Sequence, residues 1–137
     1  MTKTDSNSGE TTIKLVTLNL IESSIFPEGK EIQPSTIFNF KISVEHLVSV
    51  EKDQLNVICK IEIGHSVENI VYGKITSSCV FEVKGINKFK EGKTIKLPGN
   101  VITQINSVSI STTRGIMFSQ FKGTFLHNAI LPLIDIK

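Results

Sequence analysis

Three stretches of the chain alternate apolar and polar residues with the period of a β-strand. From Phe38 to Val44 every second residue is apolar and its neighbours are polar. Such a pattern gives a strand one apolar and one polar face. The run from Leu55 to Ile63 repeats it after a polar stretch, so these two strands are expected to pair antiparallel. Residues 70–84 form a further predicted strand, with apolar residues gathered on one face.

A strand predicted over residues 12–26 changes its alternation partway. Ile13 and Leu15 are apolar at odd positions, whereas Leu18 and Leu20 are apolar at even positions. Because one inserted residue reverses the face on which later side chains lie, this change predicts a bulged or two-part strand. With the other three strands it predicts a four-stranded antiparallel meander.

The second half of the chain leaves one choice open. Residues 85–100 are rich in lysine and end in Pro-Gly-Asn, which is typical of a long loop. From Val101 onward the Ser, Thr, Val and Ile content favours a strand, but apolar residues recur at helical spacing. For a helix, Asn100 would be the N-cap and Gly115 an early stop, and Arg114 would pair with the last carbonyls.

The two ends of the chain lack a strand pattern. Residues 1–11 contain no apolar residue after Met1 and are expected to form a disordered tail, which leaves residues 12–137 as one domain. Residues 129–137 are apolar around Pro132 and are expected to lie extended on the core or on a sheet edge. Neither a signal-peptide pattern nor a stretch long enough to span a membrane is seen, so a cytoplasmic protein without membrane insertion is expected.

Composition favours strands over a helical bundle. Isoleucine, valine and threonine account for 43 of the 137 residues, and there is one alanine; β-branched residues suit strands. The net charge of +2 is too small to indicate a nucleic-acid or membrane partner. The lysines of residues 84–96 surround one aromatic residue, Phe89, whereas single-strand binding normally needs several. A solvated loop is therefore expected there, and no nucleic-acid partner.

Candidate catalytic and metal-binding residues are sparse. His46, His65 and His127 lie far apart in the sequence without the spacing of a metal site. Cys59 and Cys79 occupy alternating apolar strand positions, where free thiols pack as small hydrophobes, so no disulfide is expected. Phosphate-binding loops and nucleophile motifs are also missing from the sequence. We expect no metal, no cofactor and no enzymatic activity.

Four short segments lie in a recognisable order along the chain. They are Leu20–Phe26 (LIESSIF), Val80–Ile86 (VFEVKGI), Ile110–Gly115 (ISTTRG) and Ile130–Ile136 (ILPLIDI). In order and spacing they resemble segments of the SecB family of export chaperones, and the resemblance spans residues 12–136. In that family four antiparallel strands precede a long crossover loop and a helix ending in Arg-Gly. The resemblance therefore implies a helix from Val101 to about Phe118, despite its poor propensity.

The resemblance implies an α+β fold, a four-stranded antiparallel sheet packed with one long helix, assembled as a homo-oligomer, either a dimer or a tetramer. Family members bind unfolded polypeptides along hydrophobic grooves, so the implied function is an ATP-independent holdase for non-native clients. An oligomeric adaptor for one partner, such as an antitoxin, is the alternative. The candidate client-binding residues are apolar side chains near the loops and the helix end, which core packing would equally explain: Phe26, Phe89, Ile95, Phe118, Phe121 and Phe125.

Two features depart from the family pattern. The chain ends at Lys137, where the family continues into a second helix and an acidic tail that help engage the translocase motor. Acidic residues on the family's motor-docking face correspond here to Ser23 and Lys74. Since complementary charge supplies steering and specificity, binding to a translocase motor in protein export is expected to be weakened.

Overall fold

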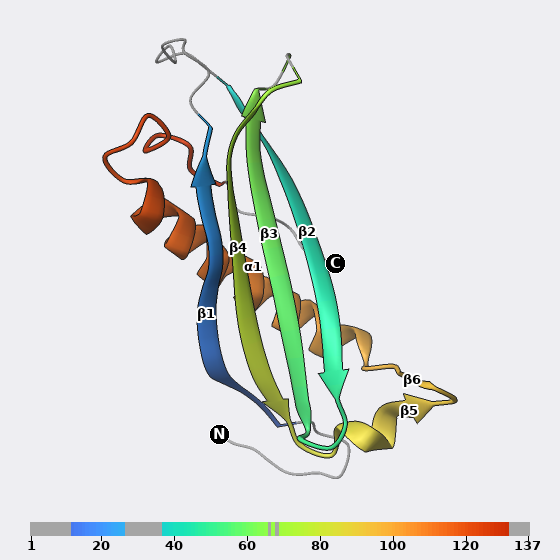
Figure 1. Ribbon diagram of the computed structural model, residues 1–137. Coiled ribbons are helices and arrows are strands. Elements are labelled where there is room, and N and C mark those ends of the chain that lie inside the picture. Colours follow the sequence, from blue (N-terminus) through green and yellow to red (C-terminus); the bar gives the residue numbers. More distant parts are fainter. Residues whose placement is uncertain (1–11, 27–36, 66, 68, 132–137) are drawn as a thin grey trace.

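A four-stranded antiparallel sheet carries one long helix across one of its faces (Figure 1). The computed structural model describes residues 12–26, 37–65, 67 and 69–131, so the predicted tail and the last six residues lie outside it. The strands are β1 (Ile13–Ile25), β2 (Phe38–Ser49), β3 (Gln54–His65) and β4 (Val71–Val83). We call the face beneath the helix the covered face and the opposite one the open face.

The strand order is β1-β4-β3-β2, which places β1 and β2 at the two edges. The predicted meander holds for β2, β3 and β4, whereas β1 lies beside β4 and not beside β2. Residues 26–37, which join β1 to β2, are too many for a tight hairpin, so the first two strands are free to occupy opposite edges. The α+β class and the four antiparallel strands are confirmed.

Two irregularities interrupt the pairing of β1 with β4. The register shifts between Leu15 and Thr17 and again between Leu20 and Glu22, which confirms the bulged strand that the phase change predicts. Each shift inserts one residue that faces no partner directly. As a result the apolar residues on both sides of the first shift stay on the covered face.

The helix α1 runs from Gly99 to Phe121 and confirms the helix that the resemblance implies. It begins after Pro98, so Asn100 lies inside the first turn and is not the cap. It also continues through Gly115, and the predicted role of Arg114 at the last carbonyls is therefore wrong, since this residue lies well before the helix end. The predicted stop fails because packing continues beyond it, as far as the buried ring of Phe121.

Packing against the sheet, not local preference, accounts for α1. The helix has no side-chain cap and no acidic residue in its first turn, and it is rich in β-branched residues. Its buried residues recur mostly every fourth position, which presents one stripe to the sheet; they are Val101, Ile105, Ser109, Ile110, Thr113, Met117 and Phe121. A side-chain hydrogen bond of 2.7 Å between His46 and Asn106 also connects β2 to the helix.

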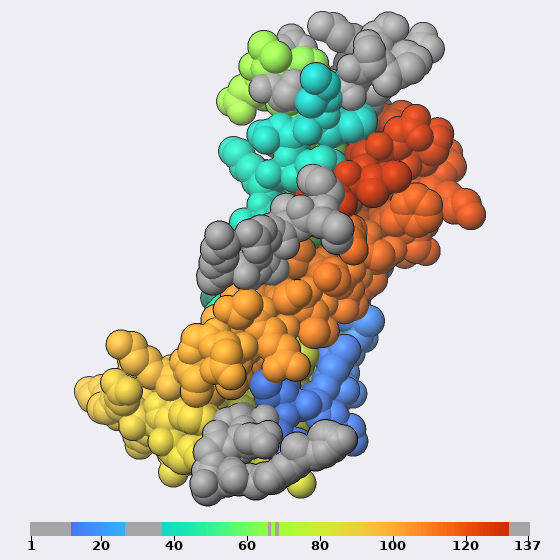
Figure 2. Space-filling model, turned by 180° about the vertical axis from the view of Figure 1, so that it is seen from behind, coloured from blue at the N-terminus to red at the C-terminus, as the bar shows by residue number. Residues whose placement is uncertain are grey.

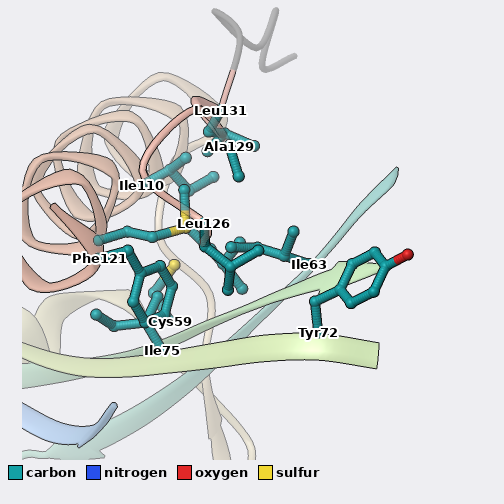
Figure 3. Close-up of a cluster of buried hydrophobic side chains, with 11 residues drawn as sticks. Cys59, Ile63, Tyr72, Ile75, Ile110, Phe121, Leu126, Ala129 and Leu131 are labelled. Carbon is teal, nitrogen blue, oxygen red and sulfur yellow. The ribbon is translucent and has the colours of Figure 1, made fainter. Parts of the chain in front are cut away.

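The core consists of two apolar clusters between α1 and the covered face. One cluster, shown in Figure 3, gathers Phe121 and Leu126 over Ile63 and Ile75. It continues into the segment after the helix, where Ala129 and Leu131 are buried. This packing agrees with the predicted placement of the chain's end on the core, as far as residue 131.

The second cluster lies at the other end of the helix and uses the stretch after β4. Residues 85–100 are not wholly a loop, because they contain a 3-10 helix, η1 (Ile86–Phe89), and a small hairpin, β5 (Lys90–Glu91) and β6 (Thr94–Ile95). Ile86 is fully buried in the same cluster as Val57 and Phe81, so η1 covers the core at the end where the helix begins.

Small hydroxyl and thiol side chains fill the middle of the interface between helix and sheet. Ser77 Oγ lies 2.6 Å from Thr113 Oγ1, and the Thr113 hydroxyl donates to the Ser109 carbonyl oxygen at 2.6 Å. All three residues are inaccessible to solvent, so these contacts satisfy groups that would otherwise be costly to bury. Cys59 and Cys79 lie in the same layer, buried and free, as the sequence predicts.

Alkaline conditions should reveal the burial of the two thiols. Burial raises the pKa of Cys59 and of Cys79 above the ordinary value of 9.0. Because the unfolded chain then loses these protons first, the stability that the neutral thiols contribute is complete below pH 9.0 and is lost as the pH rises above it. Denaturant midpoints measured from pH 7 to pH 11 should fall more steeply for the wild type than for the double variant Cys59→Ala, Cys79→Ala. Parallel curves would contradict this prediction.

Candidate functional site

An apolar strip runs along β1 and is left open by the helix. Leu15, Leu18 and Leu20 pair with β4 residues of the covered face, yet they are 39%, 44% and 42% exposed. Figure 2 shows the reason: α1 crosses the sheet diagonally, and part of β1, in blue, lies uncovered beside it. The β1 strip, as we define it, also includes the residues at the bulges and at the strand end, and comprises Leu15, Val16, Leu18, Leu20, Ile21 and Ile25.

The position of β1 adds unpaired backbone to this apolar surface. On one side β1 pairs with β4, and on the other side no strand of the described residues adjoins it. An edge strand of 13 residues offers a long row of N–H and C=O groups. Exposed apolar side chains beside unpaired backbone are what a second extended chain needs for strand addition.

Two of the residues predicted to bind clients are plainly exposed, but on different surfaces. Phe118 lies on the helix with 48% of its surface exposed. Phe26 follows β1 with 38% exposed, and its ring lies 5.7 Å from the Nζ atom of Lys74. Because Lys74 is on the open face, these two phenylalanines do not line one groove.

The remaining aromatic residues near the helix end are buried to different degrees. Phe121 is 2% exposed and belongs to the core, so it offers no surface to a partner in this structure. Phe125 is partly buried, with its ring 6.3 Å from that of Tyr72 in an edge-on arrangement. These two residues therefore support the covered face, and Phe118 alone of this group is widely open.

Phe89 and Ile95 lie at the opposite end of α1, in the stretch between β4 and the helix. Both are half-buried, and Ile95 packs against the second core cluster. Phe89 ends η1, and its ring lies 5.2 Å from the Nζ atom of Lys88. The six predicted residues thus divide among three places, and sequence reasoning missed the β1 strip, whose exposure depends on the diagonal course of the helix.

The two positions that replace the family's docking acids do not share a face. Ser23 pairs with Ile75, which is buried beneath the helix, whereas Lys74 pairs with Glu62 of β3 on the open face. The expectation that both belong to one docking surface is therefore corrected. Only the reversed charge at Lys74 bears on the open face.

The described residues give little indication of metal binding or of a membrane span. They contain no group of three or more His, Cys, Asp or Glu side chains that could hold a metal ion. Within the same residues, no helix has the length and apolarity needed to cross a membrane.

Comparison with known proteins shows the fold. No family model matches the sequence, and no curated protein matches it. Among solved structures, the chain is similar to a SecB-like chaperone of Mycobacterium tuberculosis, solved in complex with a peptide from the HigA1 antitoxin. The TM-score is 0.61 at 8% sequence identity, and the match covers 90% of each chain. The protein therefore has a SecB-like fold.

Proposed function

We propose that the protein is a SecB-like chaperone that holds non-native polypeptides on exposed apolar surface. The observation that carries the proposal is apolar surface left exposed outside the core: Phe118 on the helix, for client binding, and the β1 strip, for the assembly that presents it. Contiguous apolar patches of this kind commonly mark interaction sites. An unfolded client is recognised by its own apolar side chains, so the surface needs breadth and not catalytic geometry.

The open apolar surface also supports self-association. The chain has two sheet edges, β1 and β2, and proteins normally protect long apolar edges by pairing or covering them. We propose that β1 pairs with β1 of a second copy, in a dimer or in a tetramer built from dimers, because one surface can then meet itself about a twofold axis. Client binding is left to Phe118 and Phe89, which lie outside β1.

A second candidate function is an adaptor for a single partner, such as an antitoxin. It is favoured by the structural neighbour, which was solved with an antitoxin peptide. An adaptor of this kind would bind one protein with nanomolar affinity and ignore unrelated unfolded chains. For both functions we propose a location in the cytoplasm. For the chaperone we also propose a role in protein export, although the positive charge of Lys74 disfavours binding to a translocase motor.

Replacing Phe118 by aspartate should weaken client binding. Removing one exposed phenylalanine from a bound interface forfeits about 1.5–3 kcal/mol, which corresponds to a roughly tenfold or greater rise in Kd. Binding would be measured by fluorescence anisotropy with a labelled protein held unfolded by alkylation of its cysteines. Phe89→Asp should act in the same direction.

The matched control for this substitution is Ser119→Asp, which adds the same charge at the next exposed helix position. It should leave both the affinity and the melting temperature unchanged. If Phe118→Asp or Phe89→Asp lowers the melting temperature together with the affinity, that residue belongs to the core. If neither changes the affinity, the client surface lies elsewhere and the proposal fails.

A further inference from the structure

A hollow of about 480 Å³ opens on the open face of the sheet, away from α1. Its apolar wall consists of Phe26, Ile70 and Val71, and Lys74 and Glu62 stand beside this wall. A smaller hollow of about 60 Å³ adjoins it, sharing Glu62, Asn69, Ile70 and Val71. The smaller one is lined by polar groups, with Lys41 and the amides of Asn39 and Asn69 among them.

The charges around the two hollows are unbalanced. Lys41, Glu62 and Lys74 stand directly opposite one another on β2, β3 and β4. The Glu62 carboxylate already has a partner, because its Oε2 atom lies 3.4 Å from the Nζ atom of Lys60. Within the described part of the chain, neither Lys41 nor Lys74 forms an ion pair. The residues that line the two hollows include two lysines, Lys41 and Lys74, and one glutamate, which leaves one positive charge in surplus.

The apolar wall lies at one end of this row of charges, beside Lys74, and Lys41 stands two strands away, across Glu62. Phe26 is 38% exposed, and the Lys74 ammonium lies near its ring without a carboxylate. An aromatic ring and two aliphatic side chains suit an apolar group of a ligand. The two ammonium groups suit carboxylates, for which charge complementarity gives attraction and register.

We propose that this hollow docks an acidic peptide segment of another protein, in which an apolar side chain contacts Phe26 and carboxylates on one side of that side chain pair with Lys74 and Lys41. Nucleic acid fits less well, because a single aromatic ring offers little stacking. The site lies on the face opposite α1, so it is separate from the proposed client surface and does not depend on it.

The probe is a fluorescein-labelled peptide, Asp-Glu-Leu-Phe-Glu-Asp, titrated with the full chain and followed by anisotropy. Lys74→Glu and Lys41→Glu should each raise Kd about tenfold, and Phe26→Ala should raise it as well. Lys14→Glu is the matched control, because Lys14 is exposed on the same face near the other end of β1 and pairs with Glu82. The control should bind as the wild type does.

A charge exchange separates specific docking from general attraction. The peptide Lys-Lys-Leu-Phe-Lys-Lys should bind the double variant Lys41→Glu, Lys74→Glu better than the wild type. Equal loss in Lys14→Glu and Lys74→Glu would overturn the proposal, as would wild-type binding of a thymidine 12-mer at least as tight as that of the acidic peptide. The proposal would also be overturned if the wild type showed no detectable binding of the acidic peptide. If binding appeared only in the variant Glu28→Gln, Glu31→Gln, the proposal would be overturned in favour of the chain's own residues 27–36 as the occupant of the hollow.

Discussion

Replacing Gly64 by alanine is expected to lower the free energy of unfolding by about 1–3 kcal/mol. A Cβ atom at this position would lie 2.6 Å from the carbonyl oxygen of Ile70. That oxygen accepts the backbone N–H of His65 at 3.1 Å and so closes the end of the β3–β4 pair. Backbone cannot yield as a side-chain tip can, so the strand end must shift and the hydrogen bond must weaken. Urea unfolding followed by circular dichroism measures the change.

The matched control is Gly115→Ala in the exposed part of α1. A Cβ atom there would meet nothing within 4 Å, and alanine favours a helix over glycine by about 1 kcal/mol. The two variants add the same methyl group and should change stability in opposite directions. A neutral or stabilising Gly64→Ala would mean that the close approach at the end of β3 is not present in solution.

Replacing Leu18 by aspartate is expected to dissociate the proposed homo-oligomer. If β1 strips meet about a twofold axis, both copies bring Leu18 to the interface, and each substitution buries a carboxylate where apolar side chains were. A loss of about 3 kcal/mol or more corresponds to at least a 100-fold rise in the dissociation constant. Sedimentation velocity over a range of concentrations would show a shift from dimer or tetramer to monomer.

Asn19→Asp is the control for this substitution, because it places the same charge one residue along β1, opposite Ser78 on the open face. It should leave the assembly intact, and circular dichroism should show both variants folded. A wild type that sediments as a monomer at all concentrations, or a Leu18→Asp variant that stays assembled, would rule out self-association through the β1 strip.

The sequence predicts most of the sheet, because a strand with one buried face needs an apolar residue at every second position. Alternation locates the strands that contain Phe38 and Leu55, and the phase change after Leu15 predicts a bulge that the register confirms. Alternation does not reveal which strands are neighbours, so the place of β1 beside β4 required the structure. Local preference does not predict the helix either, because a polar residue such as Thr113 is buried through its contact with Ser77 of the sheet.

The candidate sites were harder to predict because they depend on where elements cross. Phe118 and Phe121 are three residues apart on one helix, yet one is widely exposed and the other is in the core. Sequence spacing cannot separate them without the direction in which α1 crosses the sheet. The alignment of Lys41 and Lys74 on the two sides of Glu62 likewise follows from the strand register, since these residues are far apart in the chain.

The central claim, that this protein holds non-native polypeptides, is tested most directly by an aggregation measurement. A chemically unfolded, slowly folding model protein would be diluted into increasing amounts of the wild-type chain, and light scattering would be recorded. We expect scattering to be suppressed near one oligomer per client, without ATP. Full aggregation at a several-fold excess of folded, assembled protein would contradict general chaperoning and leave the single-partner adaptor as the function to pursue.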